Sequence, residues 1–136
     1  MVKLIEDIWV LDKAGIVVFH RTYDKDLDVQ LFGGLMSALN SFAENLSEEG
    51  LTSFELSQKK FAIIRKNEFL FIGNAKNKTK EKEIVRELES ISEKFFELYA
   101  DIIETWQGDI TLFQNFENEI EDSLEGTIER FKKAFW

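Results

Sequence analysis

The sequence predicts an α+β domain in which helices pack on a five-stranded antiparallel sheet. Five short segments rich in β-branched and aromatic residues are separated by short connections, which is typical of strands that pair antiparallel. Two long segments, and a shorter one near the C-terminus, instead carry apolar residues at the spacing of amphipathic helices. The predicted order is strand, strand, helix, three strands, helix, helix.

The composition indicates one folded domain. The chain has 136 residues, of which 44% are hydrophobic and 13 are Phe, enough for a real core. It contains no Cys, which excludes disulfides, thiolate nucleophiles and sulfur-ligated metals. No apolar run is long enough for a membrane span, and charge interrupts the N-terminus too early for a signal peptide. We therefore expect a cytoplasmic protein that reaches membranes only through partners.

The net charge of −9 is unevenly distributed. Residues 81–125 hold 14 acidic side chains against Lys82, Arg86 and Lys94, which gives −11 for this segment alone. Such a surface repels polyanions, so we expect no nucleic-acid partner.

The first two strands are predicted to form a hairpin, with arms from Leu4 to Leu11 and from Ile16 to Thr22. The connection ends in Gly15, which supplies the positive φ that such a turn needs. Alternation places Trp9 and Leu11 on one face of the first arm and Ile8 and Val10 on the other. Both faces are therefore apolar, and something must cover each of them.

A helix is predicted to begin just after Asp28, whose carboxylate can accept hydrogen bonds from the first helical turn. Gly33 and Gly34 cost this helix about 2 kcal/mol relative to alanines, so we expect its backbone to approach the hairpin closely there. Gly50 is expected to stop the helix or to lie in the loop behind it. The apolar stripe that we expect to lie on the sheet consists of Phe32, Leu35, Met36, Leu39, Phe42, Ala43 and Leu46.

Three further strands are predicted at Leu51 to Leu56, Lys60 to Arg65 and Phe69 to Gly73, paired as an antiparallel meander. The last two are apolar on both faces, which indicates central or doubly covered strands. A long helix follows from Glu81 to about Trp106, and an acidic helix then starts near Phe116. We expect the first helix on one side of the sheet and the later helices with it or beside it.

This order of elements resembles the longin-type fold, a profilin-like architecture, over about residues 4–125. The resemblance rests on Ile8 to His20, Leu35 to Phe42, Trp106 to Asp109, and Phe113 to Phe116. Small subunits of clathrin-type adaptors and of the coatomer, and the longin domains of some SNAREs, look similar. The roadblock fold is a close relative that carries an additional helix before the first strand, where this chain has only Met1 to Lys3.

The resemblance implies a non-enzymatic platform in small-GTPase-linked or membrane-trafficking-like processes. Its partner would be a small GTPase or another longin-like or roadblock-like chain, and homodimers are an option. The alternative is a PAS-like or profilin-like module that senses a small molecule or binds a cytoskeletal partner, because a sheet and a helix can enclose a pocket lined by Phe side chains.

No catalytic constellation emerges from the residues. His20 is the only histidine, and we expect it on the sheet surface or partly buried, without a relay. Asp24, Asp26 and Asp28 imitate the first ligands of a calcium loop, but Val29 stands where that loop requires Gly. We expect no enzyme activity, no cofactor and no metal.

The candidate partner-binding residues are aromatic or large apolar side chains that need cover. Residues 126–136 are predicted to form an amphipathic tail helix that follows the domain of residues 1–125. Large aromatic side chains at a chain end are costly to leave in water, so the tail can dock on the domain, on a second copy or on a partner. The hairpin residues await the same cover, or burial in the core. The candidates are Trp9, Leu11, Phe131, Phe135 and Trp136.

Overall fold

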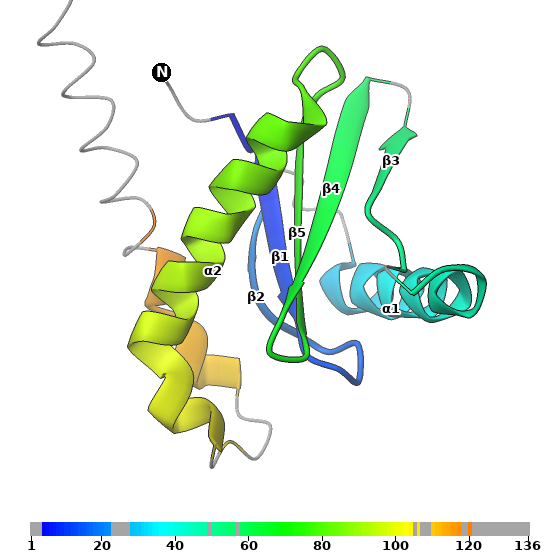
Figure 1. The fold of residues 1–136 in the computed structure, drawn as a ribbon. Helices are drawn as coiled ribbons and strands as arrows, with labels where there is room; N and C mark the ends of the chain where they lie inside the picture. Colours follow the sequence, from blue (N-terminus) through cyan, green and yellow to red (C-terminus); the bar gives the residue numbers. More distant parts are fainter. Residues whose placement is uncertain are drawn as a thin grey trace, which may run out of the picture.

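The computed structural model describes residues 4–22, 28–48, 50–56, 58–104, 106, 110–117 and 120. A five-stranded sheet forms the centre of the molecule, with every neighbouring pair antiparallel and the strand order β2-β1-β5-β4-β3 (Figure 1). The predicted fold class and the predicted meander are confirmed. The elements are β1 (Asp7–Leu11), β2 (Val17–Arg21), α1 (Val29–Leu46), β3 (Ser53–Leu56), β4 (Lys59–Lys66), β5 (Phe69–Lys76), α2 (Glu81–Glu104) and the 3₁₀ helix η1 (Ile110–Phe113).

The β1–β2 hairpin has the predicted turn. Gly15 adopts φ +87°, and the Asp12 carboxylate accepts hydrogen bonds from the backbone N–H groups of Ala14 and Ile16, both at 2.9 Å. The turn thus satisfies its own backbone donors and fixes the register in which β2 returns along β1.

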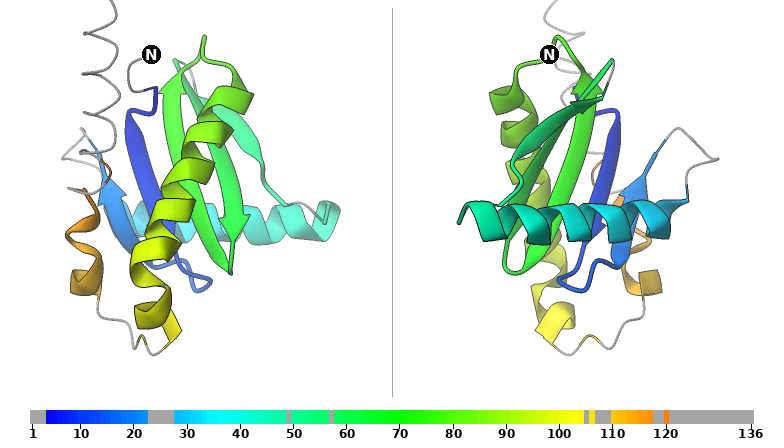
Figure 2. Two further views of the ribbon diagram at one scale, coloured as in Figure 1. Left: turned by 60° about the vertical axis from the view of Figure 1, so that its left-hand side comes forward. Right: turned by 90° about the vertical axis from the view of Figure 1, so that its right-hand side faces the viewer.

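Helices cover both faces of the sheet. α2 lies on one face and α1 crosses the opposite face (Figure 2). This corrects the expectation that the later helices lie with or beside the first one. Because side chains alternate along each strand, β1 and β5 supply a separate apolar cluster to each helix.

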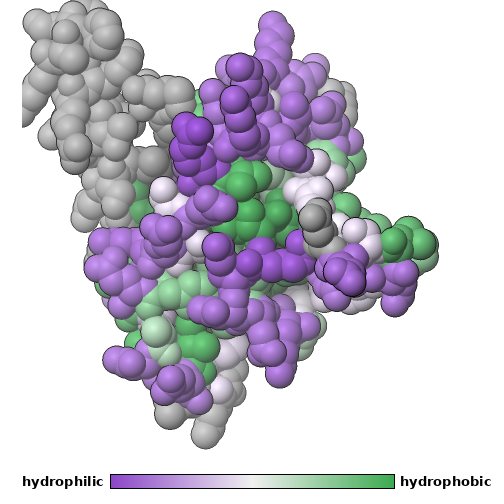
Figure 3. Space-filling view, in the orientation of Figure 1, coloured by the Kyte–Doolittle hydropathy of each residue, from purple (hydrophilic) through white to green (hydrophobic). Residues whose placement is uncertain are grey.

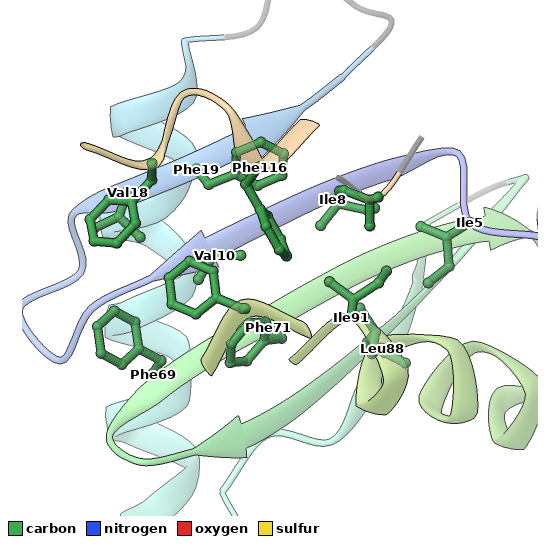
Figure 4. Packing of buried hydrophobic residues seen from close by; sticks show 14 of the residues in the cluster. Ile5, Ile8, Val10, Val18, Phe19, Phe69, Phe71, Leu88, Ile91 and Phe116 are labelled. Carbon is green, nitrogen blue, oxygen red and sulfur yellow. The ribbon is translucent and has the colours of Figure 1, made fainter. Parts of the chain in front are cut away.

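The α2 side holds the larger cluster. Phe71 of β5 lies beside Leu88 and Ile91 of α2, and Phe19 of β2 lies against Phe116 beyond η1 (Figure 4). The rings of Phe19 and Phe116 meet edge to face with centroids 5.0 Å apart. The segment after α2 therefore completes this face of the core. Residues 116, 117 and 120 are helical, and the remainder of the predicted last helix lies outside the described residues.

On the other face, α1 begins as predicted. The Asp28 carboxylate accepts a hydrogen bond of 3.0 Å from the Leu31 N–H, which caps the helix. One turn further, Gly33 packs directly on the hairpin, because a Cβ there would lie 2.5 Å from Val17 Cγ2 and 2.9 Å from the Gly15 carbonyl oxygen. The expected close approach is thus confirmed for Gly33. A Cβ at Gly34 would meet nothing within 4 Å.

Most of the predicted α1 stripe does not lie on the sheet. Of this stripe, Met36 is buried and Phe32 packs, partly buried, against the cluster around Trp9, while the buried residues of α1 are Gly33, Met36 and Asn40. α1 contains a single charged residue, Glu44, so charge does not distinguish its inward side from its outward one. The close contact at Gly33 fixes the helix rotation instead.

Among the described residues, no helix combines the length and hydrophobicity that crossing a bilayer requires. The loop after α1 holds Gly50 at φ +68°, in agreement with the predicted helix stop and loop.

The two adjacent glycines give a matched pair of stability predictions. Gly33→Ala should lower the free energy of unfolding by about 1–3 kcal/mol, because the new methyl group overlaps Val17 and the hairpin backbone. Gly34→Ala should raise it by about 1 kcal/mol, because alanine is the better helix former and the site is open. Urea denaturation at a low protein concentration measures both. Equal effects of the two substitutions would contradict the observed helix rotation.

Candidate protein-interaction surface

The outward side of α1 is the most apolar exposed surface of the described structure. Large side chains on it are 41–77% exposed, whereas charge is almost absent, because Glu44 is the only charged residue among the 18 residues of the helix. Monomeric proteins rarely expose contiguous apolar patches of this kind unless they bind something. The outer α1 face is defined here as Leu31, Gly34, Leu35, Ala38, Leu39, Phe42 and Leu46.

The residues of the outer α1 face follow helical spacing and form one stripe. Leu31, Leu35, Leu39, Phe42 and Leu46 succeed one another at intervals of three or four residues, so their side chains are neighbours. Part of this stripe appears as green surface where α1 reaches the edge of the molecule (Figure 3). Gly34 and Ala38, which are exposed and small, lie along one side of this stripe.

The free edge of the sheet lies on the same side of the molecule. Among the described strands, β3 pairs only with β4, and it borders the end of the sheet that α1 also reaches (Figure 1). Leu56 of β3 is 56% exposed, while Phe54 stacks on Phe61 with ring centroids 4.5 Å apart. An edge strand offers unpaired backbone groups to an incoming strand. The outer α1 face and the β3 edge can therefore meet one partner together.

A polar network beneath α1 holds the outer α1 face in place. Asn40 is buried, and its side-chain oxygen accepts hydrogen bonds from the Arg65 guanidinium of β4 and, at 3.2 Å, from the Leu51 N–H. The same guanidinium donates to the Leu51 carbonyl at 2.6 Å. These bonds tie the second half of α1 and the following loop to the sheet, so the exposed side chains stand on a fixed support.

Trp9 and Leu11 are not surface residues. Their exposed fractions are 2% and 0%, and the Trp9 ring lies 4.3 Å from the ring of Phe32 on α1. Alternation put both on one face as predicted, but α1 covers that face. The hypothesis that this pair awaits a partner is corrected, since the chain covers it itself.

The other sequence-based candidates divide between the surface and the undescribed segments. Phe131, Phe135 and Trp136 lie outside the described residues, as do Asp24 and Asp26. Asp28 caps α1, and His20 is exposed on β2. Within the described part of the chain, no group of three His, Cys, Asp or Glu side chains is placed to hold a metal ion.

Sequence reasoning missed the outer α1 face as a site. The available signal was the single charged residue in α1, because a helix that turns one side to water normally carries several charged residues there. The predicted stripe assigned the apolar residues of α1 to the core, so it did not show that α1 has more of them than the sheet buries.

Comparisons with known proteins agree with this architecture. The family model described as the first longin domain of FUZ, MON1 and HPS1 matches residues 6–100. No curated protein sequence matches the chain. Among solved structures, MglB of Myxococcus xanthus is similar with a TM-score of 0.53 and 14% identity, over 68% of this chain and 84% of that chain. A roadblock/LC7 domain from Streptomyces avermitilis is similar with a TM-score of 0.51 and 16% identity, over 70% of this chain and 88% of that chain. At these identities the likeness establishes a shared fold.

The placement of α1 predicts opposite outcomes for two of its large side chains. Phe42→Ala should change the free energy of unfolding by less than about 0.5 kcal/mol, because Phe42 is 65% exposed. Met36→Ala should cost about 2–5 kcal/mol, because Met36 is 3% exposed and packs in the core. Urea denaturation of the two variants compares them, and a large loss with Phe42→Ala would place that ring in the core.

Proposed function

The chain belongs to the family of the first longin domain of FUZ, MON1 and HPS1, and we propose that it is a non-enzymatic protein-interaction domain that pairs with a second longin-like domain. The observation that carries this proposal is the outer α1 face, an apolar helix surface with one charged residue in the whole helix. The second domain is a copy of this chain or a relative of it.

Energetics favour a helix as the occupant of the outer α1 face. Fully burying one Leu or Phe side chain stabilises an interface by about 1.5–3 kcal/mol, and this surface offers five such side chains that are at least 41% exposed. Because the surface carries so little charge, its desolvation costs little. An apolar helix of similar character is the matching surface, and a second α1 supplies one.

Ala38 lies at the centre of the outer α1 face, and this position suggests how two copies would pair. Gly34 and Phe42 stand four residues before and after it, so in an antiparallel pair centred on Ala38 each Phe42 is level with Gly34 of the other helix. There the ring can enter the hole between Leu31, Gly34, Leu35 and Ala38 of the second copy. Gly34 costs α1 about 1 kcal/mol, and no contact with another described residue requires it, so close approach of a partner helix would explain its presence.

The process that the paired domain serves follows from the longin resemblance, which implies small-GTPase-linked or membrane-trafficking-like work. A dimer of such domains would form a platform that binds a small GTPase. A PAS-like or profilin-like sensor of small molecules is the less favoured alternative, because large side chains fill the interior on the α2 side. Phe71, Phe95 and Phe113 are each 0% exposed there.

Cysteine cross-linking tests the proposed pairing, since the chain has no Cys of its own. Ala38→Cys should form disulfide-linked dimers by itself, because the two copies of this residue face each other at the centre. Gly34→Cys should cross-link with Phe42→Cys in a mixture, but not with itself. Eight residues of helix, about 12 Å, would separate the two copies of position 34, and a disulfide needs Cα atoms within about 7 Å.

Ser90→Cys on the exposed side of α2 is the control and should stay monomeric under the same oxidation. Self-cross-linking of Gly34→Cys and Phe42→Cys without cross-linking between them would indicate a parallel pair. The protein concentration is raised to the highest value at which Ser90→Cys stays monomeric. If Ala38→Cys forms no disulfide-linked dimer there, pairing through the outer α1 face is overturned.

The GTPase part of the proposal has its own prediction. The immobilised chain should retain a small GTPase from its host lysate more strongly in one nucleotide state, GDP or a non-hydrolysable GTP analogue, as identified by mass spectrometry. Leu35→Asp on the outer α1 face should reduce this retention, whereas Leu98→Asp on α2, a similarly apolar exposed position, should not. If Leu35→Asp and Leu98→Asp retain equal amounts of the GTPase, the GTPase does not bind through the outer α1 face.

A further inference from the structure

A second apolar surface lies at the other edge of the sheet. A groove of about 590 Å³ runs between β2, the first turn of α1 and the segment that begins with η1. Its walls are mostly apolar, with Phe19, Val29, Ile110 and Phe113 among them, and Glu117 stands on its rim. Ile110 is 39% exposed, so this end of the molecule also leaves hydrophobic surface in water.

The groove is suited to side chains rather than to an added strand. The amide group of Gln30 on α1 is paired with the backbone of Val17 on β2, donating to its carbonyl and accepting from its N–H, both at 3.1 Å. An incoming strand would need those same two backbone groups. Because Gln30 occupies them, strand addition is blocked at Val17, which favours an occupant that binds through apolar side chains.

The chain itself leaves the described structure beside this groove. Phe116 packs on Phe19, and Ile120, which is 3% exposed, joins the same cluster. Sixteen residues follow Ile120. Phe131 comes 11 positions later, within reach of any part of the groove, since 11 extended residues span up to about 40 Å. Gly126 stands between them as a residue that readily permits a reversal of direction.

The composition of this C-terminal segment matches the groove. Phe131 and Phe135 are four residues apart, as the neighbouring side chains of one helical face would be, and Trp136 ends the chain. Arg130, Lys132 and Lys133 make residues 127–136 basic, in contrast to Glu117 on the rim of the groove. Aromatic rings are stabilised by leaving water, and a cationic side chain can pair with the Glu117 carboxylate.

We propose that residues 127–136 fold back within the same chain and dock Phe131 and Phe135 in the groove between β2 and η1. This intrachain site is distinct from the outer α1 face, and it does not depend on the proposed pairing. It assigns the aromatic end of the chain a place on its own domain and leaves the outer α1 face free for a partner.

Paramagnetic relaxation enhancement on the full-length chain tests the docking. A nitroxide on Ala134→Cys, the only Cys in that variant, should erase the backbone amide signals of His20, Gln30 and Gln114 around the groove. The signals of Phe42 and Leu46, at the far end of α1 from Gln30, should persist. Erased signals at that far end of α1 instead, or no erased signals outside the tail, would overturn the proposal.

Two controls complete the design. Ile110→Asp, placed on an exposed wall residue, should restore the groove signals while the rest of the spectrum remains that of the folded domain. In a mixture of nitroxide-labelled chain with isotope-labelled wild type, the groove signals of the wild type should remain. Their loss would mean that the tail docks on a second copy, which contradicts an intrachain site. None of these outcomes depends on the cross-linking of Ala38→Cys.

Discussion

The antiparallel pairing of β1 with β5 is the interaction on which the rest of this structure depends. It joins the N-terminal hairpin to the later meander, from Asp7 opposite Asn74 to Leu11 opposite Leu70. At its start, Asn74 and Asp7 also exchange side-chain hydrogen bonds, with the Asn74 amide donating to the Asp7 carboxylate at 3.0 Å and accepting from the Asp7 N–H at 3.2 Å. Without this junction there would be a two-stranded and a three-stranded piece, neither wide enough to carry a helix on each face.

The close contact at Gly33 determines how α1 uses its surface. By bringing the helix backbone against Val17 and Gly15, it turns Met36 inward, with Phe32 partly buried beside it, and leaves five other large side chains outward. The hydrophobic residues of α1 thus exceed what the sheet buries. Exposed Leu35 and Phe42 contribute nothing to the core of this chain, and this excess is the reason for proposing a second surface on α1.

Features encoded by a few neighbouring residues were predictable from the sequence. The Gly15 turn, the Asp28 cap and the meander follow from local chemistry, and the two-sided apolarity of residues 69–72 identified β5 as a central strand. Features that depend on distant packing were not predictable. Trp9 and Leu11 are buried because α1 crosses above them, and the position of α2 on the opposite face is a property of the whole fold. The roles of Phe131, Phe135 and Trp136 remain predictions.

The side-chain amide of Gln30, hydrogen-bonded to both backbone groups of Val17, gives the sheet two unequal edges. A sheet with two open edges can add strands at each and grow into a fibre. Here α1 lends one residue to occupy the backbone of β2 at Val17, whereas no such side chain is bonded to the outer edge of β3 among the described residues. Strand addition is therefore hindered at the start of β2 and favoured at β3, so any extension of the sheet has a preferred direction.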